Sequence, residues 1–244
     1  MKNTIVKRAA GALVMALSLT FAAANLQAQK NDELREARDE AKDAARVLNT
    51  MMKKPDDFIP RELLQKAEAI AVFPGVVKGA FIVGGRGGDG VVARRTADGW
   101  SVPVFYNMGG ASFGAQIGVE KTDYILLFMN EGALRELLDD KLEFGGELSF
   151  AAGPVGRTAG ASTNLTLDSG ILTWSMSKGA FVGASLKGAY IEPDDNANRA
   201  VYGMAGKALI ENPAQAKMTG LPREITSFTQ TVASYAGNKR MAQK

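Results

Sequence analysis

Glycine is the residue whose placement most restricts the fold of this chain. Of the 27 glycines, 22 lie between Gly75 and Gly188, where they separate short runs of Val, Ile, Phe, Tyr and Trp. In strands, glycine marks bends and close approaches of the backbone. Short apolar runs separated by turn residues at this spacing indicate a mostly antiparallel sheet that curves into a sandwich or a partial barrel. The predicted strands include residues 80–83, 102–106, 124–129, 165–167, 171–176 and 181–190.

Helical patterns flank this central region. Between residues 31 and 52, apolar side chains recur every three or four positions, which predicts an amphipathic helix. A shorter helix is expected at 60–67, and another at 131–140 behind an Asn130 N-cap. The C-terminal helices are expected at 196–202, 206–211 and 222–235. With no linker in between, the sequence predicts one α+β domain: a curved, mostly antiparallel β-sheet with N-terminal and C-terminal helices packed on it.

The N-terminus reads as a secretory signal. Lys2, Lys7 and Arg8 precede an apolar stretch, and a small-residue exit ends at Ala28. We therefore expect a signal peptide at 1–28 and a single domain at 29–244. The apolar stretch is short and alanine-rich for a membrane anchor, which is the alternative reading. Without cysteine there is no lipobox, so the predicted location is periplasmic or secreted.

The charge balance argues against nucleic acid as a partner. The chain has a formal charge of +3, but the first 28 residues hold three basic and no acidic side chains. The remainder is therefore neutral overall, and only its C-terminal stretch is net positive, which makes a nucleic-acid binder unexpected.

The chain also has no cysteine and no histidine, which excludes thiolate and imidazole catalysis and nearly every common zinc site. No stretch offers the alternating ligands of a calcium loop. We predict a non-enzymatic protein with no metal and no cofactor.

Two glycine motifs resemble functional signatures. The run Gly85-Arg86-Gly87-Gly88-Asp89-Gly90 satisfies G-x-G-x-x-G, but a predicted strand, 91–95, follows it where a dinucleotide site needs a helix. We interpret it as a glycine hairpin. The phrase Lys-Gly-Ala-aromatic occurs at residues 78–81, 178–181 and 187–190, and we interpret it as a sequence that suits crowded, curved strands.

A basic stripe on the first helix is the strongest candidate for a binding site. At about 100° per residue, Arg35, Arg38, Lys42 and Arg46 lie within a stripe about 80° wide that borders the apolar face. Long basic side chains in this position suit a helix that lies on anionic lipid. Acidic side chains beside the stripe equally suit a helix that packs on the sheet with a salt-bridged outer surface. Secondary candidates for lipid contact are Lys53, Lys54, Arg94 and Arg95.

A series of ordered motifs resembles the SYLF-domain family over nearly the whole chain after residue 31. They are Leu63-Leu64, Lys66-Ala67, Ala69-Ile70-Ala71-Val72-Phe73-Pro74, Lys78-Gly79, Gly84-Gly85-Arg86-Gly87, Trp100-Ser101-Val102-Pro103, the stretch 109–118, the stretch 153–157, and Lys187-Gly188-Ala189. Eukaryotic members of that family resemble phosphoinositide-binding modules with an amphipathic N-terminal helix, and fungal relatives bind and bundle actin filaments. Bacterial members are similar to this chain in having a signal peptide and a single domain.

The resemblance implies a non-enzymatic lipid-binding protein of the bacterial envelope, with anionic phospholipid as its partner. The alternative is a structural or protein-interaction module of the envelope, with an unidentified protein partner and the first helix packed permanently on the sheet. Burial of Leu34, Ala41, Leu48 and Met52 would favour this alternative. A hydrolase that uses Ser or Asp is a third class, which only a convergent pocket of perturbed carboxylates would favour.

Overall fold

The computed structural model describes residues 2–53, 59–80, 84–112, 118–139, 141–145, 150–153, 169–181 and 186–237. Its helices are α1 (Lys2–Met52), α2 (Arg61–Lys66), α3 (Glu131–Leu137), α5 (Asp195–Tyr202), α6 (Gly206–Glu211) and α7 (Arg223–Ala236), with a 3-10 turn at Pro213–Gln215. Its strands are β1 (Ala69–Ala80), β2 (Gly84–Thr96), β3 (Gly99–Trp100), β4 (Val104–Ser112), β5 (Gly118–Phe128), β6 (Leu142–Glu143), β7 (Phe150–Ala152), β8 (Ile171–Ser177), β9 (Ala180–Phe181) and β10 (Ala189–Pro193).

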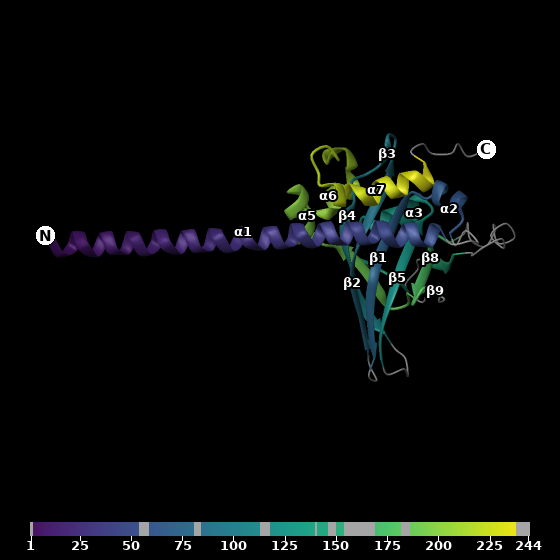
Figure 1. Cartoon of the computed structure of the whole chain (residues 1–244), viewed down its shortest axis with the longest axis horizontal. Coiled ribbons are helices and arrows are strands. Elements are labelled where there is room, and N and C mark those ends of the chain that lie inside the picture. Colours follow the sequence, from purple (N-terminus) through teal and green to yellow (C-terminus); the bar gives the residue numbers. More distant parts are fainter. Residues whose placement is uncertain are drawn as a thin grey trace.

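The described strands form one sheet that curls into a half-barrel (Figure 1). The main path runs β6-β10-β4-β2-β1-β5-β8-β7, while β3 pairs with β2 and β9 pairs with β8. Every pairing is antiparallel except that of β7 with β8. The predicted α+β fold with a curved, mostly antiparallel sheet is therefore confirmed. The predicted strand at 165–167 lies outside the described residues.

The glycine-rich segment 85–90 is not the hairpin that we predicted. It lies inside β2 and is paired on both sides, so that Gly87 is opposite Val77 of β1 and Gly109 of β4. A Cβ atom at Gly90 would lie 2.6 Å from Phe73 Cγ, closer than such atoms approach in proteins. Glycine therefore serves here to let large side chains of β1 pack against the backbone of β2, which a turn would not require.

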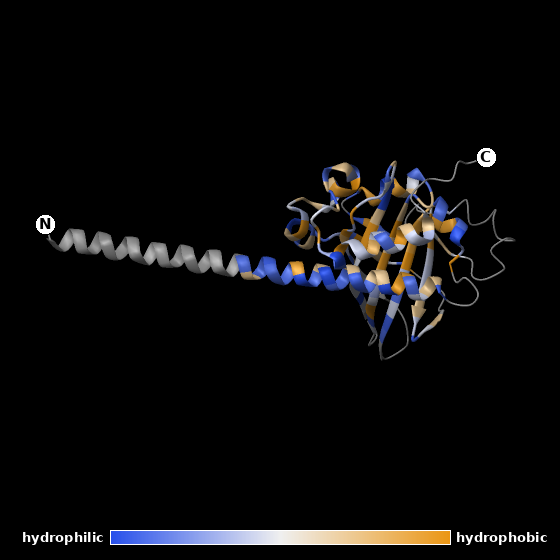
Figure 2. Ribbon diagram, turned by 45° about the horizontal axis from the view of Figure 1, so that its top comes forward, coloured by the Kyte–Doolittle hydropathy of each residue, from blue (hydrophilic) through white to orange (hydrophobic). Residues whose placement is uncertain are grey.

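Helices α1, α2, α5 and α7 cover one face of the sheet. In Figure 1, α1 and α7 lie side by side across the strands, and α5 also packs against α1. Small residues of α1, among them Ala37, Ala41 and Ala44, are buried and allow the helix to approach the apolar strands, which are orange in Figure 2. The predicted helix at 31–52 is the second part of α1, which is helical from Lys2 onward.

A second core fills the other face of the sheet. Phe73, Tyr106 and Phe128 point into it, and α3 and α6 cover it. The predicted N-cap of α3 is confirmed, because the Asn130 side chain accepts a hydrogen bond of 2.9 Å from the Ala133 amide. The strands therefore separate two apolar layers, and side chains alternate between the layers along each strand.

Candidate functional site

The basic stripe on α1 points away from the sheet. Arg35, Arg38, Lys42 and Arg46 are all exposed. Arg35 lies 3.9 Å from Asp32 and Arg46 lies 2.8 Å from Asp43, and both ion pairs are exposed. Exposed pairs of this kind contribute little free energy, but they reduce the net charge that the stripe offers to a ligand.

The apolar face of α1 belongs to the core. Ala41, Leu48 and Met52 are buried, and Leu34 is partly buried against the same cluster. Removing α1 from the sheet would expose Leu48, Met51 and Met52, at a cost on the order of 5 kcal/mol or more. This burial favours the packed helix over a helix that inserts its apolar face into lipid.

Three of the four secondary candidates lie within the described residues, and two of these form hydrogen bonds inside the fold. Arg95 is buried, donates to the carbonyls of Leu64 and Ala67 at 3.0 and 2.9 Å, and lies over the Trp100 ring. Arg94 donates to the carbonyls of Ile210 and Glu211, at the C-terminal end of α6. Their guanidinium groups satisfy carbonyls at helix ends, so we do not include them in a lipid-binding surface.

Lys53 lies just beyond the end of α1 and is exposed, and Lys54 lies outside the described residues.

The structure brings together a basic pocket that the sequence analysis missed. The basic pocket has a volume of about 870 Å³ and contains four cationic side chains with one carboxylate, Glu143. The cationic residues are Lys78 of β1, Arg86 of β2, Lys141 before β6 and Lys187 before β10. Arg86 is buried, whereas Lys141 and Lys187 are exposed at the mouth. Positive charge from four separate segments therefore converges on one cavity.

Glycine shapes the wall of the basic pocket. Gly188 has φ +76°, a conformation that L residues with side chains rarely adopt. A Cβ atom at Gly110 would lie 2.7 Å from Ala189 Cα, so only glycine lets β4 approach β10 here. The Gly188 amide also donates to the Phe144 carbonyl at 2.9 Å, which ties the two loops of the pocket together. Main chain without side chains therefore lines part of the cavity.

Local contacts position Lys141 at the mouth of the basic pocket. Its Nζ lies 2.9 Å from Glu143 Oε1 and 4.0 Å from the centre of the Tyr190 ring. The hydrogen bond to Glu143 raises the pKa of Lys141, which favours its charged form. This lysine is therefore oriented before any ligand arrives.

A signal for the basic pocket was present in the sequence. Two copies of the Lys-Gly-Ala-aromatic phrase supply Lys78 and Lys187, and the G-x-G-x-x-G run supplies Arg86. The third copy places Lys178 in the β8–β9 turn, with φ +49°. The phrase therefore supplies converging lysines at two of its three positions, in addition to suiting crowded strands.

An acidic groove lies where α1 crosses the sheet. It has a volume of about 730 Å³ and contains seven carboxylates, of which five come from α1, one from β2 and one from the start of α5. They are Glu33, Glu36, Asp39, Glu40, Asp43, Asp89 and Asp194. The residues described as lining the groove include no lysine and no arginine.

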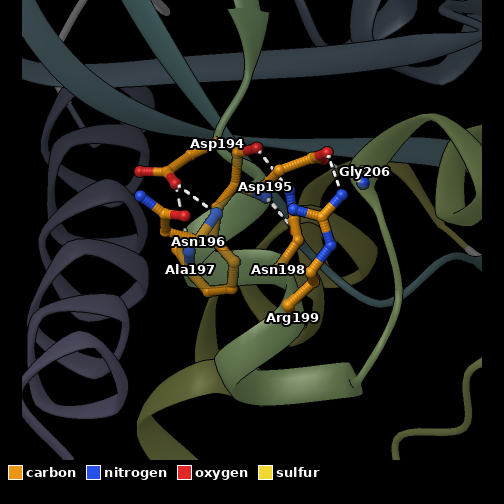
Figure 3. A network of polar contacts seen from close by, with 8 residues as sticks. Asp194, Asp195, Asn196, Ala197, Asn198, Arg199 and Gly206 are labelled. Atoms are coloured by element: carbon orange, nitrogen blue, oxygen red, sulfur yellow. Dashed lines mark hydrogen bonds and ion pairs between the residues drawn. The ribbon is translucent and has the colours of Figure 1, made fainter. Parts of the chain in front are cut away.

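The start of α5 fixes one wall of the acidic groove. Asp194 is the N-cap and accepts hydrogen bonds of 3.0 Å from the amides of Asn196 and Ala197 (Figure 3). Asp195 accepts from the Gly206 amide at 2.9 Å and pairs with Arg199 at 2.8 Å. The Asp194 carboxylate is therefore held in place at the edge of the groove.

Glu40 is the most constrained carboxylate of the acidic groove. Its Oε1 is inaccessible to solvent and has no hydrogen-bond partner among the described residues. Burial, together with the nearby charges of Asp89, Asp194 and Glu36, raises the pKa of Glu40 well above its ordinary value. Partial burial and the charges of Asp194 and Glu36 also raise the pKa of Asp89, although its side chain is still exposed to solvent. The groove therefore gathers carboxyl groups without any lysine or arginine in its described lining.

Perturbed carboxylates are also the feature that would favour a hydrolase. Acyl or phosphoryl transfer needs donors that stabilise an oxyanion, in addition to acids and bases. In the described lining of the acidic groove, the amides of Asn196 and Ala197 are occupied by Asp194, and no cationic side chain is present.

Neither a metal centre nor a membrane-spanning helix is found in the part of the chain that the structure describes. No group of three or more Asp or Glu side chains there has an arrangement that could hold a metal ion. None of the helices searched is long and apolar enough to cross a membrane.

Comparisons with known proteins identify relatives over most of the domain. Residues 109–235 match the family described as "Ysc84: Las17-binding protein actin regulator". Protein YSC84 of Saccharomyces cerevisiae is 36% identical over 178 residues, which is 69% of this chain and 38% of the yeast protein. LAS seventeen-binding protein 3 of the same yeast is 33% identical over 178 residues, or 69% of this chain and 39% of that protein.

A mammalian relative gives a longer match. SH3 domain-containing YSC84-like protein 1 of Bos taurus is 32% identical over 204 residues, which is 78% of this chain and 59% of the bovine protein. The chain therefore spans between 38% and 59% of the length of these relatives. The family match covers more than half of the chain and agrees with the resemblance of its motifs, so the chain belongs to the Ysc84 family of SYLF-domain proteins.

Proposed function

We propose that this protein binds anionic phospholipid at the bacterial envelope without catalysing a reaction, and that the basic pocket holds the headgroup. The observation that carries the proposal is the convergence of Lys78, Arg86, Lys141 and Lys187 on one cavity. An envelope location is supported by the signal-peptide pattern of residues 1–28.

The chemistry of the basic pocket suits a phosphate ester. Lysine acts as a point charge, so Lys187 can follow a headgroup as it enters, while Lys141 is already oriented toward the mouth by Glu143 and Tyr190. The guanidinium of Arg86, deeper in the cavity, offers donors in a fixed plane that match two phosphate oxygens. The glycine-lined wall lets a headgroup approach the main chain closely.

The basic stripe of α1 is a separate candidate for lipid contact. Lys78 and Arg86 lie on the opposite face of the sheet from α1, so the basic pocket and the stripe do not face the same flat membrane. The two sites therefore predict that vesicle binding is lost in different variants. We favour the basic pocket because the stripe is partly ion-paired and its apolar border is buried.

Co-sedimentation with vesicles tests the proposal. The purified protein is mixed with phosphatidylcholine vesicles with and without phosphatidylglycerol, and the bound fraction is measured. Binding to the anionic vesicles should be lost on Lys78→Glu with Lys187→Glu, and kept on Lys178→Glu, which alters the copy of the phrase outside the pocket. If changing Arg35, Arg38, Lys42 and Arg46 to glutamate abolishes binding while the pocket variant still binds, the stripe is the site.

The second candidate function is a protein-interaction module of the envelope. The buried apolar face of α1 favours it, as does the name of one yeast relative, LAS seventeen-binding protein 3. Absence of binding to any anionic vesicle by the folded wild-type protein would favour this function over the lipid proposal.

A further inference from the structure

The acidic groove carries an inference that is independent of lipid binding. Its charge is one-sided: five of its seven carboxylates come from α1, while the basic residues of that helix point outward. At about 100° per residue, Arg38 and Lys42 lie roughly on the opposite side of α1 from Glu36 and Glu40, which line the groove. The α1 sequence thus sorts its charges between the groove and the solvent.

Only part of this charge is balanced by the described residues. Asp43 pairs with Arg46 and Asp194 caps α5, whereas Glu40 and Asp89 form no ion pair in the described part of the chain. Glu40 Oε1 is buried and lacks a donor. A buried carboxylate without a donor is costly, and a cationic group in the groove would reduce this cost by its favourable interaction with the carboxylate.

The floor of the acidic groove is apolar and open. It is formed by Pro74, Gly75 and Val77 of β1 with Gly87 and Gly88 of β2. Val77 is the only large hydrophobic side chain described as exposed, at 40%. A bulge between Phe73 and Val76 shapes this floor, and the Gly75 amide is held by Asp123 Oδ1 at 2.7 Å. Acidic walls over an apolar floor match side chains that combine a hydrocarbon stem with a cationic head.

We propose that the acidic groove docks a Lys- and Arg-rich segment of a protein partner. The stems of the basic side chains would cover Val77 and the glycine backbone, and their heads would pair with Glu36, Glu40 and Asp89. A single metal ion does not fit this chemistry, since no group of three described carboxylates is arranged to hold one. The cavity of about 730 Å³ has room for several side chains of a peptide.

Fluorescence anisotropy tests the proposal with the full-length protein. The probe is a short fluorescein-labelled peptide in which Lys and Arg alternate with Gly. The control probe has Gln at every basic position. The basic peptide should bind and the Gln peptide should not. Equal binding of the two peptides, or no binding of either, would overturn the proposal.

Neutral variants locate the site. Glu36→Gln, Glu40→Gln and Asp89→Asn combined should weaken binding of the basic peptide by about tenfold or more, since each removes one carboxyl group from the proposed contact. The matched control, Glu62→Gln with Glu224→Gln, removes exposed carboxylates of α2 and α7 and should bind as the wild type does. Equal weakening in both variants would refute the groove as the site.

Three further measurements make the result unambiguous. Thermal unfolding of the triple variant reports whether it is folded; if it is not, Asp89→Asn alone, at an exposed side chain, takes its place.

Spermidine and Ca²⁺ are tested as competing ligands. If either one binds the groove at concentrations at which the basic peptide does not bind, the ligand is a small cation and the proposed peptide partner is wrong. Binding of the triple variant to anionic vesicles should be unchanged, so failure of this inference and failure of the lipid proposal are distinguishable.

Discussion

The two faces of the ribbon formed by β1 and β2 carry opposite charge, although their residues are neighbours in the sequence. Lys78 and Arg86 are paired across the ribbon and point into the basic pocket, whereas Val77, Gly87 and Asp89 line the acidic groove on the α1 side. Successive side chains of a strand point to opposite faces, so a shift of one residue exchanges one surface for the other. A count of charges along this segment shows nothing of this separation.

The two faces also differ in how tightly they are packed. Gly90, on the face of the second core, is crowded by Phe73, while a Cβ atom at Gly87 would meet nothing within 4 Å. Neighbouring glycines of one strand therefore have different roles. The one at 90 permits core packing, and the one at 87 leaves space in the groove.

Gly90→Ala should give the largest effect. The added methyl group overlaps the Phe73 ring and lies 2.6 Å from the Val72 carbonyl oxygen, so the variant should lose about 3 kcal/mol of unfolding free energy in urea titrations. Gly87→Ala is the matched control and should change stability by less than about 1 kcal/mol, or increase it. Similar losses at the two positions would contradict the packing difference between the faces.

Lys78→Ala combined with Lys187→Ala should come next. Removing two of the four cations of the basic pocket should weaken binding to phosphatidylglycerol vesicles by about tenfold or more at physiological ionic strength. Lys178→Ala should bind as the wild type does, and raising the salt concentration should reduce the difference between the two variants. If the pocket variant binds the vesicles with unchanged affinity, the basic pocket is not the lipid-binding site.

Glu40→Gln tests the acidic face through pH. Because burial and the charges of Asp89, Asp194 and Glu36 raise its pKa, Glu40 binds its proton more tightly in the folded state. Its stabilising contribution is complete below the ordinary value of 4.5 and is lost as pH rises through the raised pKa. The variant should exceed the wild type in stability by about 1 kcal/mol at pH 8, in thermal or urea unfolding, and by progressively less toward pH 4.5.

A constant difference between Glu40→Gln and the wild type across this range would show that packing, and not charge, distinguishes the two proteins. Glu62→Gln, at an exposed position on α2, is the control and should leave the pH profile unchanged.

The smallest effect is expected at the outward face of α1. Arg46→Ala removes an exposed ion pair with Asp43 and should change the unfolding free energy by less than about 0.5 kcal/mol, and by less still in high salt. A loss several times larger would mean that the stripe contributes to the packing of α1, in contrast to the exposed position of its side chains.

Local patterns were sufficient to predict most of the helices and the class of the fold. The Asn130 cap, the spacing of Ala41 and Leu48 on α1, and the starts of α5 and α7 follow from rules that depend only on nearby residues. The glycine run at 85–90 was assigned to a hairpin because its role depends on Phe73 and Val76, which are distant along the chain and meet it only through strand pairing.

The sequence by itself determined that this is a curved, mostly antiparallel sheet with helices at both ends, and its motifs identified the family. These properties depend on periodicity and on local backbone preferences. The tertiary structure decided which charges meet. It brings Lys78 and Lys187 into one pocket with two further cations, and it brings Glu40 of α1 close to Asp89 and Asp194. Charge acts over distances in space, and only strand register and helix packing convert separation along the chain into those distances.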